Sequence, residues 1–301
     1  MRVIANQVHI EVEDSAPTAG AGANDLPVVL LIMGLGMQLV SWPPGFVRGL
    51  MNAGYRVIRF DNRDIGLSDK FDQLGVPNLL WQGVKYKLGM NISAPYSLHD
   101  MARDAVGVLD ALKIDQAHIV GVSMGGMVAQ RVALLAPRRT LSLSSIMSSS
   151  GARGLPQAKP AITRLMLGRP ANTLDAAINR SVRVFKAIGS PGFPIDDEDR
   201  RAAVTYSLKR SYHPSGVLRQ MMAIVADDKR AAELANIAVP TLVVHGKADP
   251  LVPFACGQDT AQRIPGAKLV GIDGMGHDLP PGVVDRMLPL LTAHMQASAP
   301  I

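Results

Sequence analysis

Short, continuous runs of apolar residues recur along the chain, and stretches with a helical spacing separate them. The runs lie at 28–33, 55–60, 118–122, 141–147, 241–245 and 268–272. Continuous apolar runs are typical of parallel strands that are covered on both faces. After Ser97, apolar residues recur at i, i+3 and i+4 from Leu98 to Leu112, and Ser97 with Asp100 forms an N-cap pattern. Because predicted strands and helices alternate, the sequence predicts an α/β fold with a central, mostly parallel sheet flanked by helices.

One long stretch, from about Gly151 to Ile237, breaks this alternation. It contains no pattern of a buried strand, and helical patterns lie instead at 160–168, 173–188, 197–210 and 215–235. Proline and glycine signals separate these helices. We interpret the stretch as an inserted helical cap, after which the sheet resumes at Val239. The predicted organisation is a discontinuous core, residues 1–150 and 238–301, with a cap at residues 151–237.

Composition narrows the class of protein. Of the 301 residues, 48% are hydrophobic and 19% are charged, which is typical of a folded globular chain. The longest apolar run, Leu26 to Met33, is far shorter than the ~20 residues of a membrane-spanning helix, and the N-terminus lacks the apolar core of a signal peptide. The single cysteine, Cys256, cannot form an internal disulfide. We therefore expect a cytoplasmic protein that does not span a membrane.

The net charge of +6 raises the question of a nucleic-acid partner. Lysines and arginines are spread along the chain, and neither a long basic run nor a zinc-finger spacing occurs. Most of the surplus lies between Gly151 and Asp228, which hold 12 Lys and Arg against 7 Asp and Glu. We interpret this surplus as a solvated basic face and expect no nucleic-acid partner.

The sharpest chemical signal is Gly121-Val122-Ser123-Met124-Gly125, between the predicted strand at 118–122 and a helical pattern. A serine at such a tight turn needs glycines two positions before and after it, because a Cβ there would strike neighbouring backbone. The turn lifts the hydroxyl toward a substrate. An ordinary strand-to-helix turn is the competing interpretation, but the strand and helix context favours Ser123 as a nucleophile.

A serine nucleophile needs a histidine base and a carboxylate that orients it. Asp249 follows the predicted strand at 241–245, and His277 follows the strand at 268–272, so the chain order is Ser, Asp, His, which differs from the other known triad orders. Asp249 could instead initiate a turn with Pro250. Among the other histidines, His213 is the serious rival for the base.

The reaction also needs N–H donors for a developing oxyanion. The residue after the nucleophile, Met124, supplies one, and the loop after the strand at 28–33 should supply the other, with the N–H of Leu35 as the candidate. Gly34-Leu35-Gly36 with Asp61 also imitates a dinucleotide site. The third glycine of that fingerprint is missing, since position 39 is leucine.

Four segments together resemble the α/β-hydrolase superfamily: GVSMGG around Ser123, HGKADPLVP around Asp249, GMGH at His277 and RFDNRDIGLSD at 59–69. The resemblance extends over essentially the whole chain. It implies a mostly parallel sheet, a lid over the active site and a serine hydrolase mechanism without cofactor or metal. It assigns the nucleophile, acid and base to Ser123, Asp249 and His277, and the oxyanion donors to Leu35 and Met124.

Two departures from the commoner superfamily pattern sharpen the resemblance. Met33-Gly34 stands where His-Gly is usual, and Asp64 stands where a glycine is usual, as in proteins similar to aclacinomycin methylesterase. This similarity implies a carboxylesterase that acts on a small-molecule ester. Serine at position 123 argues against haloalkane dehalogenase and epoxide hydrolase chemistry, which begins at a carboxylate.

Other functions remain open on the same residues. Perhydrolysis of the haloperoxidase type, C–C bond hydrolysis and acyl transfer use the same three side chains, and some proteins of this fold are small-molecule receptors. The oligomeric state is not predicted. Apolar residues of the predicted cap either line an acyl or alcohol pocket or pack the cap onto itself: Met166, Leu167, Phe185, Ile188, Phe193, Tyr206, Tyr212, Met221 and Met222.

Overall fold

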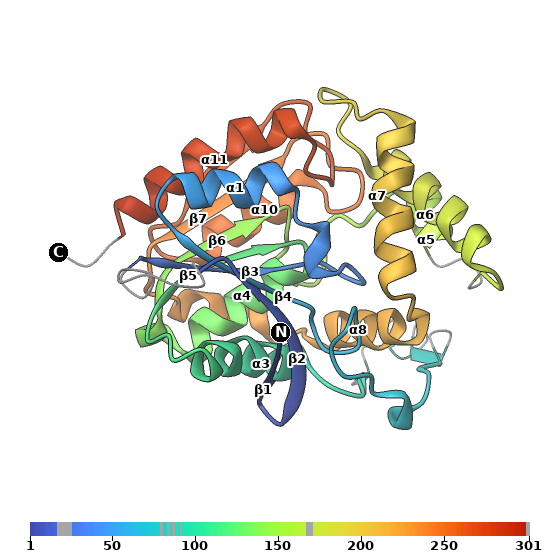
Figure 1. Ribbon diagram of the computed structural model, residues 1–301, viewed down its shortest axis with the longest axis horizontal. Coiled ribbons are helices and arrows are strands. Elements are labelled where there is room, and N and C mark those ends of the chain that lie inside the picture. Colours follow the sequence, from blue (N-terminus) through green and yellow to red (C-terminus); the bar gives the residue numbers. More distant parts are fainter. Residues whose placement is uncertain are drawn as a thin grey trace.

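The computed structural model describes residues 1–16, 26–78, 92–166 and 171–298, together with residues 81, 82, 85, 88 and 90. Within them, an eight-stranded sheet has the order β1-β2-β4-β3-β5-β6-β7-β8 (Figure 1). The β1–β2 and β2–β4 pairs are antiparallel, and the remaining pairs are parallel. The strands are β1 (Arg2–Ala5), β2 (Val8–Asp14), β3 (Val28–Ile32), β4 (Arg56–Phe60), β5 (Ala117–Val122), β6 (Thr140–Ile146), β7 (Thr241–Gly246) and β8 (Lys268–Ile272).

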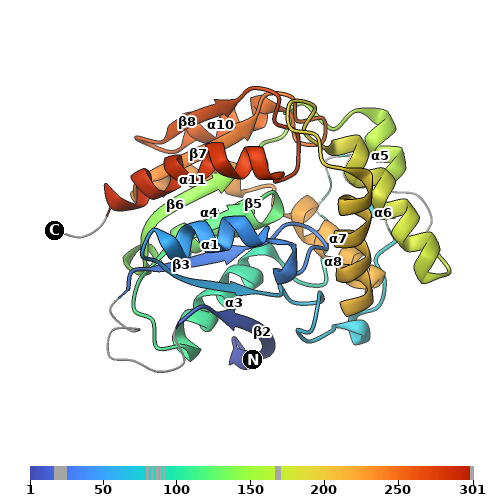
Figure 2. The ribbon, with the colours of Figure 1, turned by 45° about the horizontal axis from the view of Figure 1, so that its top comes forward.

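Helices cover both faces of this sheet (Figure 2). One face is covered by α1 (Pro44–Asn52) and α11 (Pro281–Gln296), and the other by α3 (Leu98–Ala111), α4 (Met124–Leu135) and α10 (Phe254–Arg263). Short 3-10 helices lie at η1 (Leu39–Ser41), η2 (Asp72–Leu74) and η3 (Pro137–Arg139). The predicted α/β class, with a mostly parallel sheet between helical layers, is confirmed. No helix in the described ranges is both long and apolar enough to cross a membrane.

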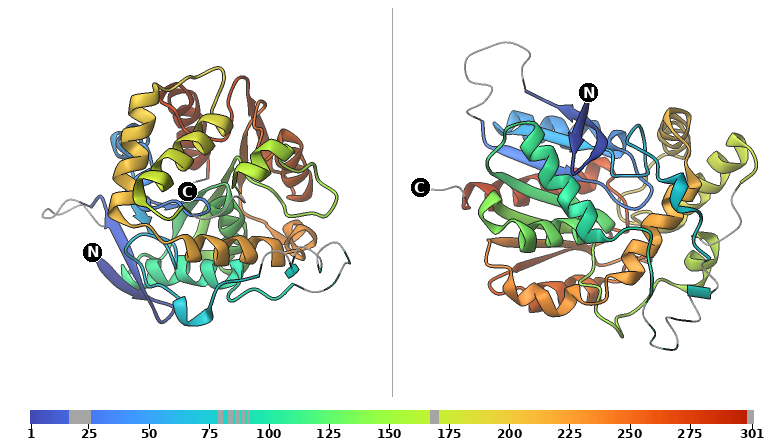
Figure 3. Two further views of the ribbon diagram at one scale, coloured as in Figure 1. Left: turned by 90° about the vertical axis from the view of Figure 1, so that its right-hand side faces the viewer. Right: turned by 90° about the horizontal axis from the view of Figure 1, so that it is seen from below.

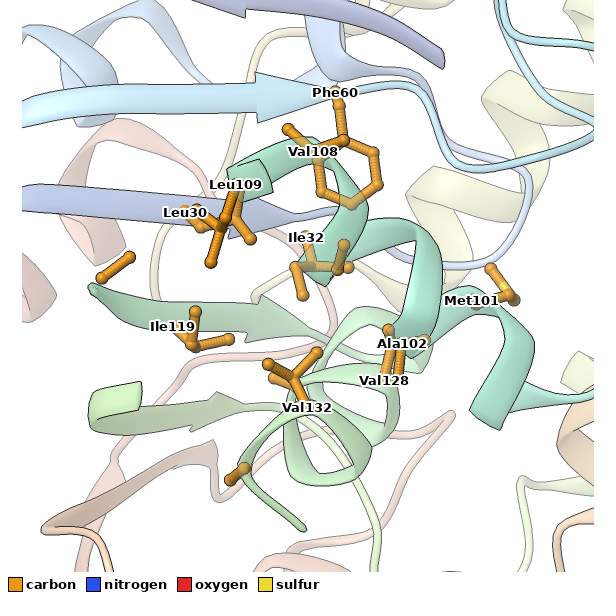
Figure 4. Packing of buried hydrophobic residues seen from close by; sticks show 14 of the residues in the cluster. Leu30, Ile32, Phe60, Met101, Ala102, Val108, Leu109, Ile119, Val128 and Val132 are labelled. Atoms are coloured by element: carbon orange, nitrogen blue, oxygen red, sulfur yellow. The ribbon is translucent and has the colours of Figure 1, made fainter. Parts of the chain in front are cut away.

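The core has one cluster on each face of the sheet. Leu30 and Ile32 of β3 point toward α3 and α4, where they pack near Val108 and Val128 (Figure 4). The alternate residues of β3 join the cluster under α1 and α11. Successive side chains of a strand point to opposite faces, so a strand buried on both sides must be apolar at every position. This explains the continuous runs in the sequence.

The sequence patterns locate most elements closely. Each of the predicted strands is present with its ends shifted by at most a residue or two, and α3 begins with the capping box of Ser97 and Asp100. The antiparallel hairpin of β1 and β2 was not predicted. The helix predicted at 215–235 is wrong as a single element, because the chain leaves the helix at Asp227 and divides it into α8 (Pro214–Ala226), α9 (Arg230–Glu233) and η4 (Leu234–Asn236).

Between β6 and β7 the chain makes a long excursion, residues 147–240, which we call the β6–β7 insertion. It contains α5 (Pro160–Met166), α6 (Leu174–Ile188), α7 (Asp197–Arg210), α8, α9 and η4. Of these helices, α5, α6, α7 and α8 lie beyond the carboxyl ends of the parallel strands (Figure 1, Figure 3), whereas η4 packs against the face of the sheet that α4 covers. The predicted helix at 160–168 ends at Met166 within the described residues, and the last residues of that prediction lie outside them.

The interpretation of the basic surplus as a solvated face is wrong for several of its arginines. Arg219 is fully buried, and the side chains of Arg200 and Arg210 are only 10% and 14% exposed. Arg210 pairs with Asp61 at 2.7 Å and Arg219 with Asp64 at 2.8 Å, both carboxylates of the loop after β4. These charges are buried because carboxylates far away in the sequence compensate for the loss of hydration.

A buried histidine predicts that the stability of the fold depends on pH in mild acid. His118 of β5 is 1% exposed, and its Nδ1 lies 2.8 Å from the Ser142 hydroxyl. Burial, assisted by His294, lowers the pKa of His118 from 6.5 to about 4. Between these values the unfolded chain binds a proton that the folded chain does not bind. We therefore expect the free energy of unfolding to fall as the pH drops from 6.5 toward 4, by up to about 3 kcal/mol from this residue.

Urea unfolding at pH 7, 6 and 5 measures this dependence, with His118→Gln as the comparison. The variant should lose less stability between pH 7 and pH 5 than the wild type does. An identical pH dependence of the two proteins would show that His118 does not contribute to it.

Candidate active site

Ser123 occupies a strained turn between β5 and α4. Its backbone has φ 54° and ψ −121°, a combination that a residue with a side chain rarely adopts. The Ser123 N–H donates to the carbonyl of Ile146 at 2.9 Å, and the Ser123 carbonyl accepts the hydroxyl of Ser148 at 2.7 Å. Hydrogen bonds from both sides thus hold the turn in place and offset part of its strain.

The glycines around Ser123 are there for the reason expected. A Cβ on Gly121 would lie 2.1 Å from the carbonyl oxygen of Gly125, and a Cβ on Gly125 would lie 2.0 Å from the carbonyl oxygen of Ile32. Neither contact is possible for a real side chain. Only glycine therefore lets α4 start this close to β5 and β3, at the carboxyl edge of the sheet.

The structure brings Ser123, His277 and Asp249 together in one hydrogen-bonded chain. His277 Nε2 lies 2.9 Å from Ser123 Oγ, and His277 Nδ1 lies 2.6 Å from Asp249 Oδ2. Because a carboxylate can only accept, Nδ1 carries the proton and Nε2 is free to accept from the hydroxyl. The other carboxylate oxygen, Oδ1, accepts the backbone N–H groups of Leu251 and Val252 at 2.9 and 2.8 Å.

A second histidine, His245, lies beside this carboxylate. Its Nε2 is 3.6 Å from Asp249 Oδ2 and donates instead to the carbonyl of Val252 at 2.7 Å. Burial lowers the pKa of His245, which keeps the ring neutral at pH 7. His245 therefore adds no positive charge beside Asp249, and His277 is the histidine that is hydrogen-bonded to this carboxylate.

The loop that carries His277 rests on the turn after α6 in the β6–β7 insertion. The His277 N–H donates to the carbonyl of Ile188 at 2.7 Å, and the Gly276 N–H donates to the hydroxyl of Ser190 at 2.8 Å. A Cβ on Gly276 would lie 2.4 Å from the carbonyl oxygen of Gly189. The same Ser190 hydroxyl bonds the carboxyl of Asp278, whose pKa is raised by burial. The insertion thus contacts the backbone of the histidine itself.

The loop after β3 lies directly against Ser123. A Cβ on Gly34 would come within 3.3 Å of the Ser123 Cβ and 3.8 Å of its Oγ. Leu35 follows Gly34, and Met124 is the first residue of α4, whose N–H has no acceptor within its helix. Within the described part of the chain, no hydrogen bond from the N–H of Leu35 or of Met124 is present. Both groups predicted to bind an oxyanion therefore lie close to the serine with their N–H groups unengaged.

The rival residues have other roles. His213 Nε2 lies 3.2 Å from Asp72 and 3.1 Å from a guanidinium nitrogen of Arg219. Asp61, the residue of the imitated dinucleotide site, is fully buried and accepts the N–H groups of Leu39 and Leu67 at 2.7 and 2.8 Å. Of the candidate bases, it is His277 that reaches Ser123. Asp61 instead holds together the two loops that contain Leu39 and Leu67.

The apolar residues expected in the predicted cap range from exposed to buried, and Met166, Phe185, Phe193 and Met221 are half-buried. Tyr206 and Tyr212 are 63% and 39% exposed, whereas Ile188 and Met222 are buried. Phe193 packs against the core cluster under α1 and α11. Leu167 lies outside the described residues.

Sequence reasoning missed two amides beside the loop at residues 33–37. Asn62 donates its Nδ2 to the carbonyl of Met33 at 3.0 Å, and Gln220 of α8 accepts the Gly36 N–H at 2.9 Å. The position of Asn62 in RFDNRDIGLSD could have indicated its role, but nothing in the sequence around Gln220 does so. Among the described residues, no three His, Cys, Asp or Glu side chains come together as a metal site would require.

Comparison with known families agrees with this geometry. A family model described as the alpha/beta hydrolase fold matches residues 27–280. The match covers most of the chain, including β3, the serine turn and the loops of Asp249 and His277. The chain therefore belongs to the α/β-hydrolase fold family.

Individual relatives are similar over nearly the full length. Rhodomycin D methylesterase DauP of Streptomyces sp. (strain C5) is 32% identical over 294 residues, 91% of this chain and 92% of that protein. Rhodomycin D methylesterase DnrP of Streptomyces peucetius is 31% identical, with the same coverage. The enol-lactonase of Burkholderia xenovorans LB400 shares the fold with a TM-score of 0.72 and 18% identity, over 98% of this chain and 100% of that one. The predicted similarity to the aclacinomycin methylesterase-like group is confirmed.

Proposed function

We propose that the protein is a serine hydrolase that cleaves carboxylic esters of small molecules. The observation that carries the proposal is the hydrogen-bonded chain from Ser123 through His277 to Asp249, on a strained turn between β5 and α4. The rhodomycin D methylesterases, named for an ester substrate, support the reaction class. The mechanism needs no cofactor and no metal.

In the first half-reaction, Ser123 Oγ attacks the carbonyl carbon of the ester as His277 Nε2 accepts the hydroxyl proton. The electron pair of the carbonyl bond moves onto its oxygen, which the N–H groups of Leu35 and Met124 stabilise. Such a donor contributes about 3 kcal/mol to transition-state binding. Asp249 holds the imidazole in the required tautomer and stabilises its charged form.

The tetrahedral intermediate then collapses. The bond to the alcohol oxygen breaks, and His277 gives its proton to the departing alcohol, which leaves an ester between the acyl group and Ser123. A water molecule, deprotonated by His277, attacks this acyl-enzyme and releases the carboxylic acid. The serine regains its proton and the cycle closes.

We propose that residues 1–150 and 238–301 form the catalytic core and that residues 151–237 form a cap over it. The insertion extends from the carboxyl edge of the sheet, where α/β proteins bind their ligands, and contacts the loops of His277 and Leu35. The lone Cys256 suits the reducing cytoplasm, where we propose that the enzyme acts.

A fluorophosphonate tests this proposal and distinguishes an enzyme from a receptor of the same fold. The probe should phosphonylate Ser123 stoichiometrically, because His277 activates its hydroxyl, and ester turnover should fall in proportion to labelling. Peptide mapping by mass spectrometry locates the label. A wild-type protein that stays unlabelled, or that carries the label elsewhere while turnover persists, would contradict the proposal.

A further inference from the structure

The loop at residues 33–37, which presents the N–H of Leu35, is held at successive peptide groups. Asn62 Nδ2 bonds the carbonyl of Met33 at 3.0 Å, and the N–H of Met37 bonds the carbonyl of Gly34 at 3.1 Å. In a planar trans peptide the C=O and the N–H point in opposite directions. The bond to the Gly34 carbonyl therefore sets the direction of the Leu35 N–H, since both groups belong to the same peptide.

The next peptide group is held from the β6–β7 insertion. The Gly36 N–H, at 2.9 Å, donates to the side-chain Oε1 of Gln220, which lies on α8 and is fully buried. The Nε2 of the same side chain donates to the carbonyl of Arg63 at 3.0 Å. The amide oxygen accepts and the amide nitrogen donates, so the two hydrogen bonds fix the orientation of the Gln220 amide. Gln220 thus joins two loops of the sheet edge through one side chain.

The contact is also tight sterically. Gly36 has a positive φ of 68°, and a Cβ there would lie 3.0 Å from Val217 Cγ2, one turn before Gln220 on α8. Without the Gln220 bond, the peptide between Leu35 and Gly36 would lose its only hydrogen-bond partner seen in the described structure. A glycine has wide backbone freedom, so this peptide could then rotate and turn the adjoining Leu35 peptide with it.

We propose that Gln220 is a positioning residue for the oxyanion site: by engaging the Gly36 N–H, it keeps the Leu35 N–H aimed at the reacting carbonyl oxygen. This inference rests on the proposed function of the Ser123 site. It assigns the β6–β7 insertion a part in transition-state stabilisation, although Gln220 itself touches no substrate. Because the oxyanion is absent from the bound ester and develops only as the tetrahedral intermediate forms, the effect belongs to kcat and not to substrate binding.

The decisive variant is Gln220→Met, which keeps the length of the side chain and removes both hydrogen bonds. Its kcat for a p-nitrophenyl ester should fall about ten- to a hundredfold with KM within about twofold, because a misaimed donor loses part of the value of an oxyanion contact. Gln220→Glu keeps an acceptor for the Gly36 N–H and should retain several-fold more activity than Gln220→Met.

A trifluoromethyl ketone provides a readout specific to the oxyanion. Ser123 Oγ adds to its carbonyl carbon, the hydroxyl proton goes to His277 and the electron pair goes to the oxygen, which then occupies the oxyanion site. The affinity of Gln220→Met for this ketone should fall by the same factor as kcat/KM. Its affinity for a non-hydrolysable ether analogue of the ester should stay within about twofold, because that ligand carries no developing charge.

Ala223→Gly is the matched control, since it loosens the same helix without touching the Gly36 bond. It should lower the melting temperature yet leave kcat and ketone affinity near wild-type values. The inference is overturned if Gln220→Met keeps its kcat and ketone affinity, if Ala223→Gly loses them equally, or if Gln220→Glu is no better than Gln220→Met. A wild-type protein that a fluorophosphonate does not label at Ser123 would overturn the proposed function and this inference together.

Discussion

Replacing Ser123 with alanine should lower kcat for a p-nitrophenyl ester about 10⁴- to 10⁶-fold and leave KM nearly unchanged. The variant lacks the oxygen that forms the acyl-enzyme, whereas the binding surface and the N–H groups of Leu35 and Met124 persist. A small residual rate over the uncatalysed reaction is therefore expected. Steady-state kinetics at saturating ester measure the loss, and circular dichroism checks that the variant is folded.

Cys256→Ala is the matched control for this prediction. Cys256 is the single cysteine, it is 3% exposed, and burial raises the pKa of its thiol, which keeps it protonated and unreactive at pH 7. Its replacement should leave kcat within about twofold of the wild type. Turnover that survives Ser123→Ala but disappears in Cys256→Ala would reverse the assignment of the nucleophile.

The parts of the site that lie in short motifs could be predicted from the sequence. Gly121 and Gly125 flank the serine because backbone on either side excludes a Cβ, and that requirement is local. Asp249 follows β7 and His277 follows β8, which are neighbouring parallel strands, so their meeting follows from the common edge at which parallel strands end. Their part in catalysis stays a prediction.

The residues that hold the site together could not be predicted in the same way. Gln220 reaches Gly36 across 184 positions of sequence, and Arg219 reaches Asp64 across 155. On a helix these two polar residues resemble an exposed face, which is how the basic surplus was interpreted. Their burial depends on partners that only the three-dimensional structure places beside them. The β1–β2 hairpin was missed although His9, Glu11 and Glu13 alternate with apolar residues, because the run at its start is short.

The β6–β7 insertion contacts two parts of the proposed active site. The turn after α6 bonds the backbone of His277, and α8 bonds the loop that presents Leu35. If these contacts hold the proposed base and oxyanion donor in place, the insertion itself has to be fixed to the sheet. Arg219, next to Gln220 on α8, forms a buried ion pair with Asp64 of the loop after β4 and provides such a fixed point.

Arg219→Met should lower the free energy of unfolding by about 3–5 kcal/mol, because it leaves a buried carboxylate without its partner. Arg219 Nε and a terminal guanidinium nitrogen bond the two oxygens of Asp64 at 2.8 Å each, and neither side chain is exposed. Burial alone would raise the pKa of Asp64, but the hydrogen bond to Arg219 holds this pKa below its ordinary value. The carboxylate thus stays charged, and without the arginine its burial is no longer compensated by an ion pair.

The double variant Arg219→Met, Asp64→Asn separates this electrostatic cost from lost packing. Asn tolerates the positive φ of 71° at position 64 and can still accept the Phe71 N–H that Asp64 Oδ1 now binds at 2.8 Å. With no charge left unpaired, the double variant should be about 1–3 kcal/mol more stable than Arg219→Met in urea unfolding at pH 7. A double variant that is no more stable than the single one would show that α8 is held by packing, and that the ion pair does not anchor it.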